Sequence, residues 1–349
     1  MAVSEWGVNS PVAVKLWSRK LFQEALKQTW MYKFIGNDDN AMIQLLDDTQ
    51  KGPGDRITVP LRMQLTALGV QGDSTLEGNE EALQVYTDNL YINQLRNAVR
   101  SGGKMSEQRV PFSVREQAQV GLSDWYAGVF DTGFFNQLAG VAAADTRQAA
   151  NNTPTAPSSN NVYYANGNAD ETAVASATAS NVMKIQFIDF ALEKAKLNSP
   201  CIRPIRMNGE DYYVMFLHPY QVTAMRVNAN AGQWFDIQKG ALTGGEITKN
   251  PIFTGALGMY NNVILHESTR VPSVVAGSYR AILCGAQAGV LAFGQDSAGN
   301  KVSWVEELFD YGNQLGVSGG MIWGGKKTVF NSQDFGVITV ITSGQAGTT

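Results

Sequence analysis

The residues of this chain with the most obvious capacity for chemistry are two histidines and two cysteines, and they lie far apart in the sequence: Cys201, His218, His266 and Cys284. A metal site needs three or four such ligands at short spacings, and these four residues form no such cluster. Two cysteines also make no disulfide framework, so we expect both to be reduced and buried. His218 precedes Pro219, where a capping or packing role is more common than catalysis.

Two glycine-rich stretches come close to known motifs, but each lacks a required residue. Gly316–Gly320 has the G-x-S-x-G spacing of a hydrolase nucleophile, yet in that motif the histidine follows the serine, and here both histidines precede it. Gly320–Lys327 approaches a phosphate-binding loop, but Lys327 stands where Ser or Thr must bind magnesium. We interpret Gly316–Gly320 as a glycine-rich turn, and we expect no catalytic residue, no cofactor and no metal.

The composition limits the class of protein. The chain has 349 residues, of which 44% are hydrophobic, with 35 Gly and 11 Pro, so it can build a sizeable core with many turns. The net charge of -4 gives no sign of a nucleic-acid-binding protein, which is usually basic. No apolar run reaches the ~20 residues of a membrane helix, and the N-terminus does not read as a signal peptide. We therefore expect synthesis in a reducing cytoplasm and no contact with a membrane.

The stretch that organises the chain is a predicted two-stranded ribbon. In its first arm, residues 57–67, apolar and polar residues alternate, which predicts a strand with one apolar face. The second arm, residues 85–95, is rich in residues that favour strands. Two arms of this length make a ribbon roughly 35–40 Å long, which is marginally stable alone. Either the rest of this chain or a second copy can cover its apolar face, which comprises Ile57, Val59, Leu61, Met63 and Leu65. We favour the second copy.

The ribbon tip and the N-terminal segment carry opposite charge. Residues 71–88 contain five acids and no base, and the first 33 residues contain five bases and two acids. Two solvated surfaces are one interpretation. Our hypothesis is that arm and tip meet across a subunit boundary, because complementary charge fixes register and speeds encounter. The tip residues are Asp73, Glu77, Glu80, Glu81 and Asp88, and the arm residues are Lys15, Arg19, Lys20 and Lys27.

A long helix is predicted directly after the ribbon. Ser113 with Glu116 has the pattern of a capping box. Apolar residues then recur at helical spacing to about residue 138; the stripe is Val114, Ala118, Leu122, Trp125 and Val129. A second helix is predicted around residues 182–195 and a third at 220–227. Strands are predicted at 212–217, 263–266, 280–284, 328–330 and 336–341, which makes the chain α+β.

The sequence from the ribbon to this helix resembles the major capsid proteins of tailed bacteriophages, in the podovirus-type branch. The resemblance covers about residues 52–126. It rests on G-D-R-I-T-V-P-L at 54–61, on G-D-S-T-L-E-G-N-E-E at 72–81, and on residues 96–109, and it continues through Trp125. A looser match includes His218–Gln221 and the last 30 residues.

The resemblance implies a fold shared with herpesvirus capsid floor proteins. It assigns residues 1–50 to an N-terminal arm, 51–112 to an extended β-hairpin loop, and 113–200 to a spine helix and peripheral domain. Residues 201–310 would form an axial domain, and 311–349 would return to the peripheral domain. In that fold the extended loop lies across a neighbouring subunit.

The function implied is that of a capsid subunit, made in the bacterial host cytoplasm, that forms the hexamers and pentamers of an icosahedral virion head around double-stranded DNA. Its partners would be copies of itself, a separate scaffolding protein, a portal and non-specifically packaged DNA; a decoration protein is left open. One alternative is another polymerising phage protein, such as a tube or tail subunit, and a second is a soluble α/β enzyme.

Overall fold

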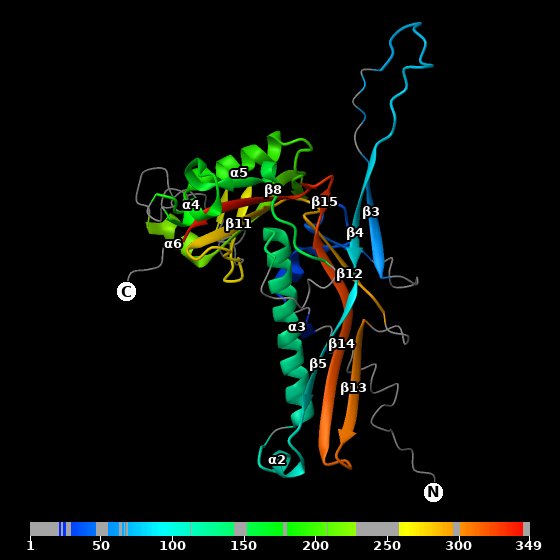
Figure 1. Ribbon diagram of the computed structural model, residues 1–349, viewed down its shortest axis with the longest axis vertical. Coiled ribbons are helices and arrows are strands. Elements are labelled where there is room, and N and C mark those ends of the chain that lie inside the picture. The colour runs from blue at the N-terminus through cyan, green and yellow to red at the C-terminus, as the bar shows by residue number, and fades with distance from the viewer. Residues whose placement is uncertain are drawn as a thin grey trace.

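The molecule is elongated, with two β-sheets and a thin ribbon that projects beyond them (Figure 1). The computed structural model describes residues 21, 24–25, 29–46, 55–62, 65, 67, 69–111, 113–142, 152–176, 180–207, 209–227, 258–295 and 301–344. None of the helices they form is both long and apolar enough to cross a lipid bilayer.

Helix α3 (Val114–Ala139) confirms the long predicted helix and runs beside β14 and β5 (Figure 1). Ser113 is its N-cap residue, but the capping box does not form: the Ser113 side chain makes no capping bond, and its carbonyl accepts a hydrogen bond from the Gln117 N–H. The helix ends at Gly140, whose φ of 64° is the left-handed conformation that glycine adopts most easily.

A six-stranded sheet packs against α3, and β14 is its central strand. The strand order is β1–β2–β12–β14–β13, and β5 also pairs with β14. The Tyr126 hydroxyl of α3 donates a hydrogen bond to the Gly319 carbonyl at 2.8 Å. The strands are β1 (Ile35–Gly36), β2 (Ile43–Leu46), β5 (Asn93–Arg100), β12 (Gly289–Phe293), β13 (Val302–Phe309) and β14 (Gln314–Lys327).

The predicted glycine-rich turn at Gly316–Gly320 is wrong, because these residues lie inside β14. The glycines are required by close neighbours rather than by a change of direction. A Cβ at Gly319 would lie 3.1 Å from the Leu21 side chain, and a Cβ at Gly325 would lie 3.0 Å from the Phe134 ring. Glycine in a strand interior commonly marks such a close approach.

The second large sheet has seven strands and packs with three helices. Its order is β6–β17–β11–β8–β10–β9, with β7 paired to β8. The predicted strands and helices of this region are confirmed to within a few residues. The elements are β6 (Val162–Tyr164), α4 (Glu171–Ser176), α5 (Ile185–Leu197), β7 (Ile205–Met207), β8 (Glu210–Leu217), α6 (Pro219–Val227), β9 (Gly258–Tyr260), β10 (Val263–Glu267), β11 (Ser278–Cys284) and β17 (Val337–Ser343).

The two sheets do not follow the boundaries predicted at residues 200 and 310. β6, α4 and α5 precede residue 200 but pack with the seven-stranded sheet. The predicted unit 311–349 is divided, since β14 joins one sheet and β17 the other. All seven residues of β17 are buried, and a strand buried on both faces belongs inside a covered sheet.

The projecting ribbon consists of β3 (Arg56–Arg62) and β4 (Val85–Tyr91), paired antiparallel from Arg56↔Tyr91 to Arg62↔Val85. Both strands are shorter than predicted. The second arm changes partner at Ile92, and the chain continues as β5 in the six-stranded sheet. The remaining elements are short: η1 (Trp30–Phe34), α2 (Lys104–Gln108), η3 (Ser159–Asn161), η4 (Ala165–Gly167), β15 (Val329–Phe330) and β16 (Gln333–Asp334).

Candidate intersubunit interface

The base of the ribbon is packed within its own chain. Ile57 and Leu90 are cross-strand neighbours, and both are buried in a small cluster with Ile92, Val290 and Ala292. The last two residues belong to β12. The expectation that another copy covers the whole apolar face is therefore wrong for the base, where this chain supplies the cover.

Beyond the base, the ribbon becomes progressively uncovered. Val59 and Leu61 are half-buried, and Met63 lies outside the described residues. Farther out, four apolar side chains are more than half exposed: Leu65 (57%), Leu76 (61%), Leu83 (58%) and Val85 (51%). Apolar groups gathered on one projecting element commonly mark an interaction surface.

Four of the five predicted acidic residues lie at the tip, and all four are exposed: Asp73, Glu77, Glu80 and Glu81. Two of them also hold the shape of the tip. The Glu80 carboxylate accepts the Gly78 N–H at 2.8 Å, and the Glu81 carboxylate accepts the Ala67 N–H at 2.8 Å. The tip thus carries exposed negative charge, and two of its carboxylates also stabilise its backbone by hydrogen bonds.

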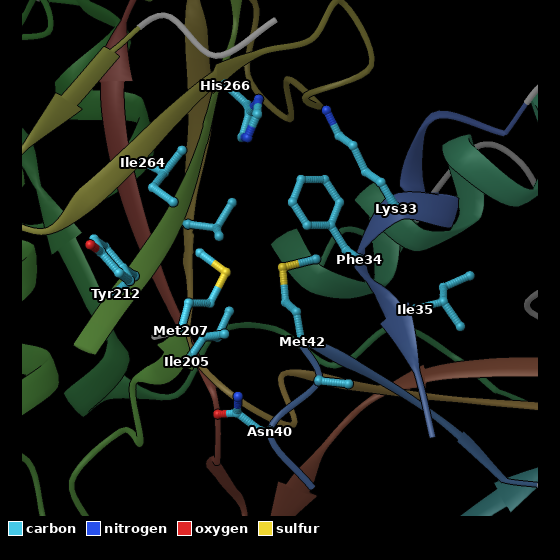
Figure 2. Close-up of a pocket in the computed structure, with 12 residues that line it drawn as sticks. Lys33, Phe34, Ile35, Asn40, Met42, Ile205, Met207, Tyr212, Ile264 and His266 are labelled. Atoms are coloured by element: carbon cyan, nitrogen blue, oxygen red, sulfur yellow. The ribbon is translucent and has the colours of Figure 1, made fainter. Parts of the chain in front are cut away.

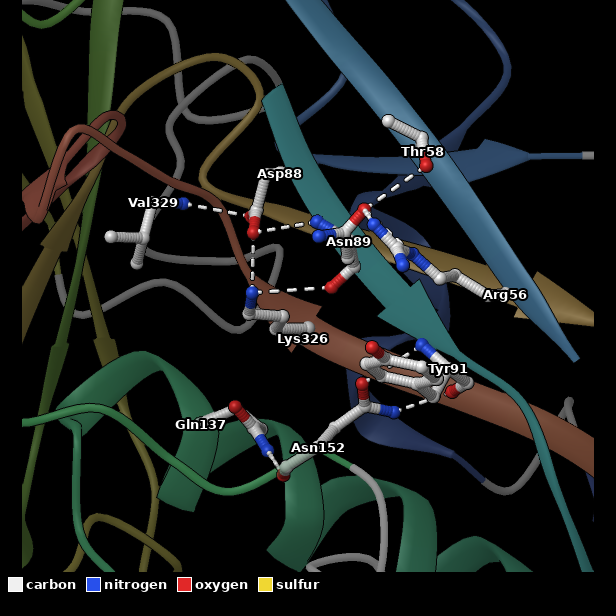
Figure 3. Close-up of polar contacts among 9 residues, drawn as sticks. All are labelled: Arg56, Thr58, Asp88, Asn89, Tyr91, Gln137, Asn152, Lys326 and Val329. Atoms are coloured by element: carbon white, nitrogen blue, oxygen red, sulfur yellow. Dashed lines mark hydrogen bonds and ion pairs between the residues drawn. The ribbon is translucent and has the colours of Figure 1, made fainter. Parts of the chain in front are cut away.

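Asp88 was predicted to belong to this tip, and that assignment is wrong. Asp88 lies on β4 near the base and is only 8% exposed. Its carboxylate forms an ion pair with Lys326 and accepts the Val329 N–H at 3.1 Å (Figure 3). The sequence shows that Asp88 is acidic, but it does not show that folding brings Lys326 next to it.

Further polar contacts surround the ribbon base (Figure 3). The buried Asn152 accepts the Tyr91 N–H at 3.0 Å, and its amide donates to the Tyr91 carbonyl. On the exposed side of β4, the Asn89 side chain accepts hydrogen bonds from Arg56 and from Thr58. Sequence reasoning missed Asn152 and Lys326, because no local pattern links them to the ribbon.

The predicted arm residues Lys15, Arg19, Lys20 and Lys27 lie outside the described residues. The described chain does present exposed bases at the end of the molecule opposite the tip, on β5 and around α2 (Figure 1). These are Arg96, Arg100, Lys104 and Arg109. Arg100 lies 4.3 Å from the centroid of the Phe309 ring, a cation–π contact.

The predicted spine residues face the interior of this chain. Leu122 and Val129 are buried in the main core, whereas Val114 and Trp125 are half-buried. The Trp125 ring meets the Tyr126 ring edge-on, with centroids 4.9 Å apart. Leu122, Val129 and Trp125 all contact the main core, so they hold α3 within its own subunit.

The candidate chemical residues show packing roles. His218 stacks on the Tyr279 ring at 4.1 Å, and its Nδ1 accepts the Tyr220 N–H, which agrees with the predicted capping or packing role; burial lowers the pKa of its imidazole. Cys284 is buried as expected, but Cys201, in the connection after α5, is exposed. Among the described residues, no three His, Cys, Asp or Glu side chains could together hold a metal.

A cavity of about 270 Å³ lies where the two sheets meet. Lys33 and His266 stand at one end of it and Asn40 at the other (Figure 2). The Lys33 ammonium lies 4.2 Å from the Trp30 ring centroid, and partial burial lowers its pKa. The Asn40 amide pairs with both the N–H and the carbonyl of Arg206. Most of the remaining lining is aliphatic or aromatic: Phe34, Ile35, Ala41, Met42, Ile205, Met207, Tyr212, Val214 and Ile264.

Comparisons with known proteins agree with this geometry. The "Major capsid protein" of Pseudomonas phage KPP25 is 29% identical over 364 residues, with 93% of each chain covered. The solved capsid of Ralstonia phage GP4 is 30% identical, with a TM-score of 0.79 over 100% of this chain and 97% of that one. The capsid of cyanophage Pam1 shares the fold, with a TM-score of 0.74 and 21% identity over 93% of this chain and 94% of the other. The family model described as phage capsid protein matches residues 5–346, and this chain therefore belongs to the phage capsid protein family.

Proposed function

We propose that this chain is the major capsid protein of a phage and assembles into the hexamers and pentamers of an icosahedral head that encloses double-stranded DNA. The observation that carries the proposal is the ribbon, whose outer half projects from the subunit with apolar side chains exposed. A second copy can cover these side chains, and repeated contacts of this kind between unlike surfaces close into rings. Each contact can be weak because every subunit makes several.

The domain roles in the assembled shell follow the sheets. Residues 55–92 act as the extended loop, and α3 with the six-stranded sheet acts as the spine and peripheral layer. The seven-stranded sheet with α4, α5 and α6 acts as the axial layer at the capsomer centre. This division modifies the boundaries at 200 and 310, because β6, α4, α5 and β17 pack with the axial strands.

The proposed partners besides copies of the chain are a separate scaffolding protein, a portal, and packaged DNA that the shell contacts without sequence preference. The net charge of -4 suits a container, since a strongly basic wall would hold DNA by many phosphate contacts. The role is structural and involves no catalysis. The protein would be made in the bacterial cytoplasm and end in the virion.

The test is removal of the ribbon tip. The purified protein is examined by size-exclusion chromatography and negative-stain microscopy, beside a variant from which Gly69–Ala82 is deleted. We expect closed shells or capsomers from the unaltered chain, and a folded, unassembled subunit from the variant. Open tubes from the unaltered chain would favour a tube or tail subunit, a lone monomer would contradict assembly, and an unfolded variant would make the tip part of the subunit core.

A further inference from the structure

The ribbon leaves the six-stranded sheet at one point, around Tyr91. Up to Tyr91 the strand β4 pairs with β3, and from Asn93 onward the strand β5 pairs with β14. Between them, the Ile92 N–H donates to the Asp55 carbonyl at 2.8 Å. A two-stranded ribbon of which one strand continues into a sheet can pivot at such a change of partner unless other contacts fix its direction.

The first fixing contact is Asn152. Its side-chain amide pairs with both the N–H and the carbonyl of Tyr91, as a residue of a neighbouring strand would. The backbone carbonyl of Asn152 in turn accepts a hydrogen bond from Gln137 of α3 at 2.6 Å. Asn152 thereby ties the ribbon base to the spine helix (Figure 3).

The second contact is a close approach of two backbones. A Cβ at Gly324 of β14 would overlap the Tyr91 carbonyl oxygen. Only glycine lets β14 pass Tyr91 at this distance. The backbone of β14 thus limits rotation of the ribbon toward the sheet.

The third contact lies three residues farther out along β4, at Asp88. The Lys326 ammonium pairs with the Asp88 carboxylate and donates to the Asn89 carbonyl at 3.2 Å. The same carboxylate accepts the Val329 N–H. Because Asp88 is 8% exposed, these charge-assisted bonds are shielded from solvent, and the loss of one partner leaves the other charge without its pair in a largely buried place.

We propose that Asn152, Gly324, Lys326 and Asp88 form a ribbon-base clamp that sets the direction in which the ribbon leaves the subunit, and through it the angle between neighbouring copies in the shell. The inference rests on the proposed function. A ribbon of about seven residue pairs spans ~23 Å, so a rotation of about 10° at the base moves its far end by about 4 Å. A displacement of that size changes how a rigid subunit meets its neighbour and hence how the ring closes.

The experiment compares Asn152→Ala and Asp88→Ala with Asn89→Ala. Asn89 is the matched control, because its side chain also bonds within the ribbon but only to Arg56 and Thr58, outside the clamp. Hydrogen exchange at the Tyr91 amide in unassembled subunits reports the clamp, and electron microscopy of assembled particles reports shell diameter. We expect at least tenfold faster exchange for Asn152→Ala, and a severalfold broader diameter distribution for both clamp variants. Asn89→Ala should match the unaltered protein in both measurements.

The variant Lys326→Arg keeps the ion pair with Asp88 but has a longer side chain. It tests the clamp if the alanine variants do not fold. A shifted or broadened diameter supports the clamp. Particles of unchanged diameter and uniformity from folded clamp variants would overturn it while leaving the proposed function intact. Failure of the unaltered protein to assemble would instead count against the proposed function.

Discussion

At the scale of single residues, buried ion pairs hold segments of this subunit together. Lys327 is fully buried and pairs with Asp334 at 2.7 Å, and its ammonium also donates to the Thr155 carbonyl. Burial lowers the pKa of Lys327 and raises the pKa of Asp334, although each partner opposes the shift of the other. Such a pair adds little net stability when intact and is costly to break from one side.

We predict that Lys327→Met lowers the free energy of unfolding by about 3–5 kcal/mol at neutral pH, and less in acid. Without Lys327, the pKa of Asp334 rises further above its unfolded value, because burial then acts unopposed. Because its folded pKa is raised, Asp334 binds a proton more tightly in the folded state than in the unfolded state. The stability that this proton contributes is fully present below the unfolded pKa of about 3.9, and it is lost as pH rises through the folded pKa.

Urea unfolding of unassembled subunits between pH 4 and pH 8 measures this effect. The deficit of Lys327→Met should grow with pH, and the double variant with Asp334→Asn should show a smaller deficit without that slope. A deficit equal at every pH would show that lost packing, rather than the unpaired carboxylate, causes the destabilisation.

At the scale of elements, the local patterns found most helices and strands but not their partners. Helical spacing predicted α3 and α5, and apolar runs predicted β8, β10, β11 and β17, because burial of one face or both is written in the residue types. The prediction for β14 was wrong, because its glycines are required by close contacts with α3 and β4, which are distant in sequence. The clamp residues Asn152 and Lys326 escaped notice for the same reason, whereas the exposed acids of the tip needed no partner to be recognised.

Two glycine substitutions separate close packing from intrinsic helix preference. Gly336 precedes β17, and a Cβ there would lie 2.6 Å from the Ala288 Cα, which is backbone and cannot turn aside. We predict that Gly336→Ala lowers the free energy of unfolding by about 1–3 kcal/mol. Gly121 lies in α3, and a Cβ added to it would meet nothing within 4 Å, so Gly121→Ala should raise the free energy of unfolding by up to about 1 kcal/mol.

Chemical denaturation of the unassembled subunit measures both changes, and the opposite signs act as mutual controls. Equal stability of Gly336→Ala and the unaltered chain would mean that Gly336 and Ala288, which precede β17 and β12, can move apart without cost.

At the scale of the whole molecule, the ribbon tip stands out as a cluster of acidic residues. Four exposed acids gather at the ribbon tip, whereas β5 and α2 carry exposed bases (Figure 1) with the exposed acids Glu116 and Asp310 in the neighbouring segments. The N-terminal bases add a second positive segment. Our proposal that tip and arm meet between subunits predicts that encounter depends on both charges.

Reversal of Glu77, Glu80 and Glu81 to Lys should slow assembly at least tenfold at low salt, and less at high salt, because screening removes the repulsion. Reversal of Lys15, Arg19, Lys20 and Lys27 in the same chain should restore the rate. Light scattering follows the kinetics. The control reverses three exposed acids outside the ribbon, Glu193, Glu210 and Glu267, which changes net charge equally and should leave the rate near that of the unaltered protein. Rescue by reversal of Arg96, Arg100, Lys104 and Arg109 instead would move the partner surface to the β5 end.

The continuity of β4 into β5 has a mechanical consequence. β5 is bound along eight residues of β14, and β14 is bound along eight residues of β13. A pull on the ribbon by a neighbouring subunit therefore runs along β5 and strains those hydrogen bonds together, in shear, instead of peeling them apart one after another. Tension along the ribbon would thus act in the direction in which this sheet resists most.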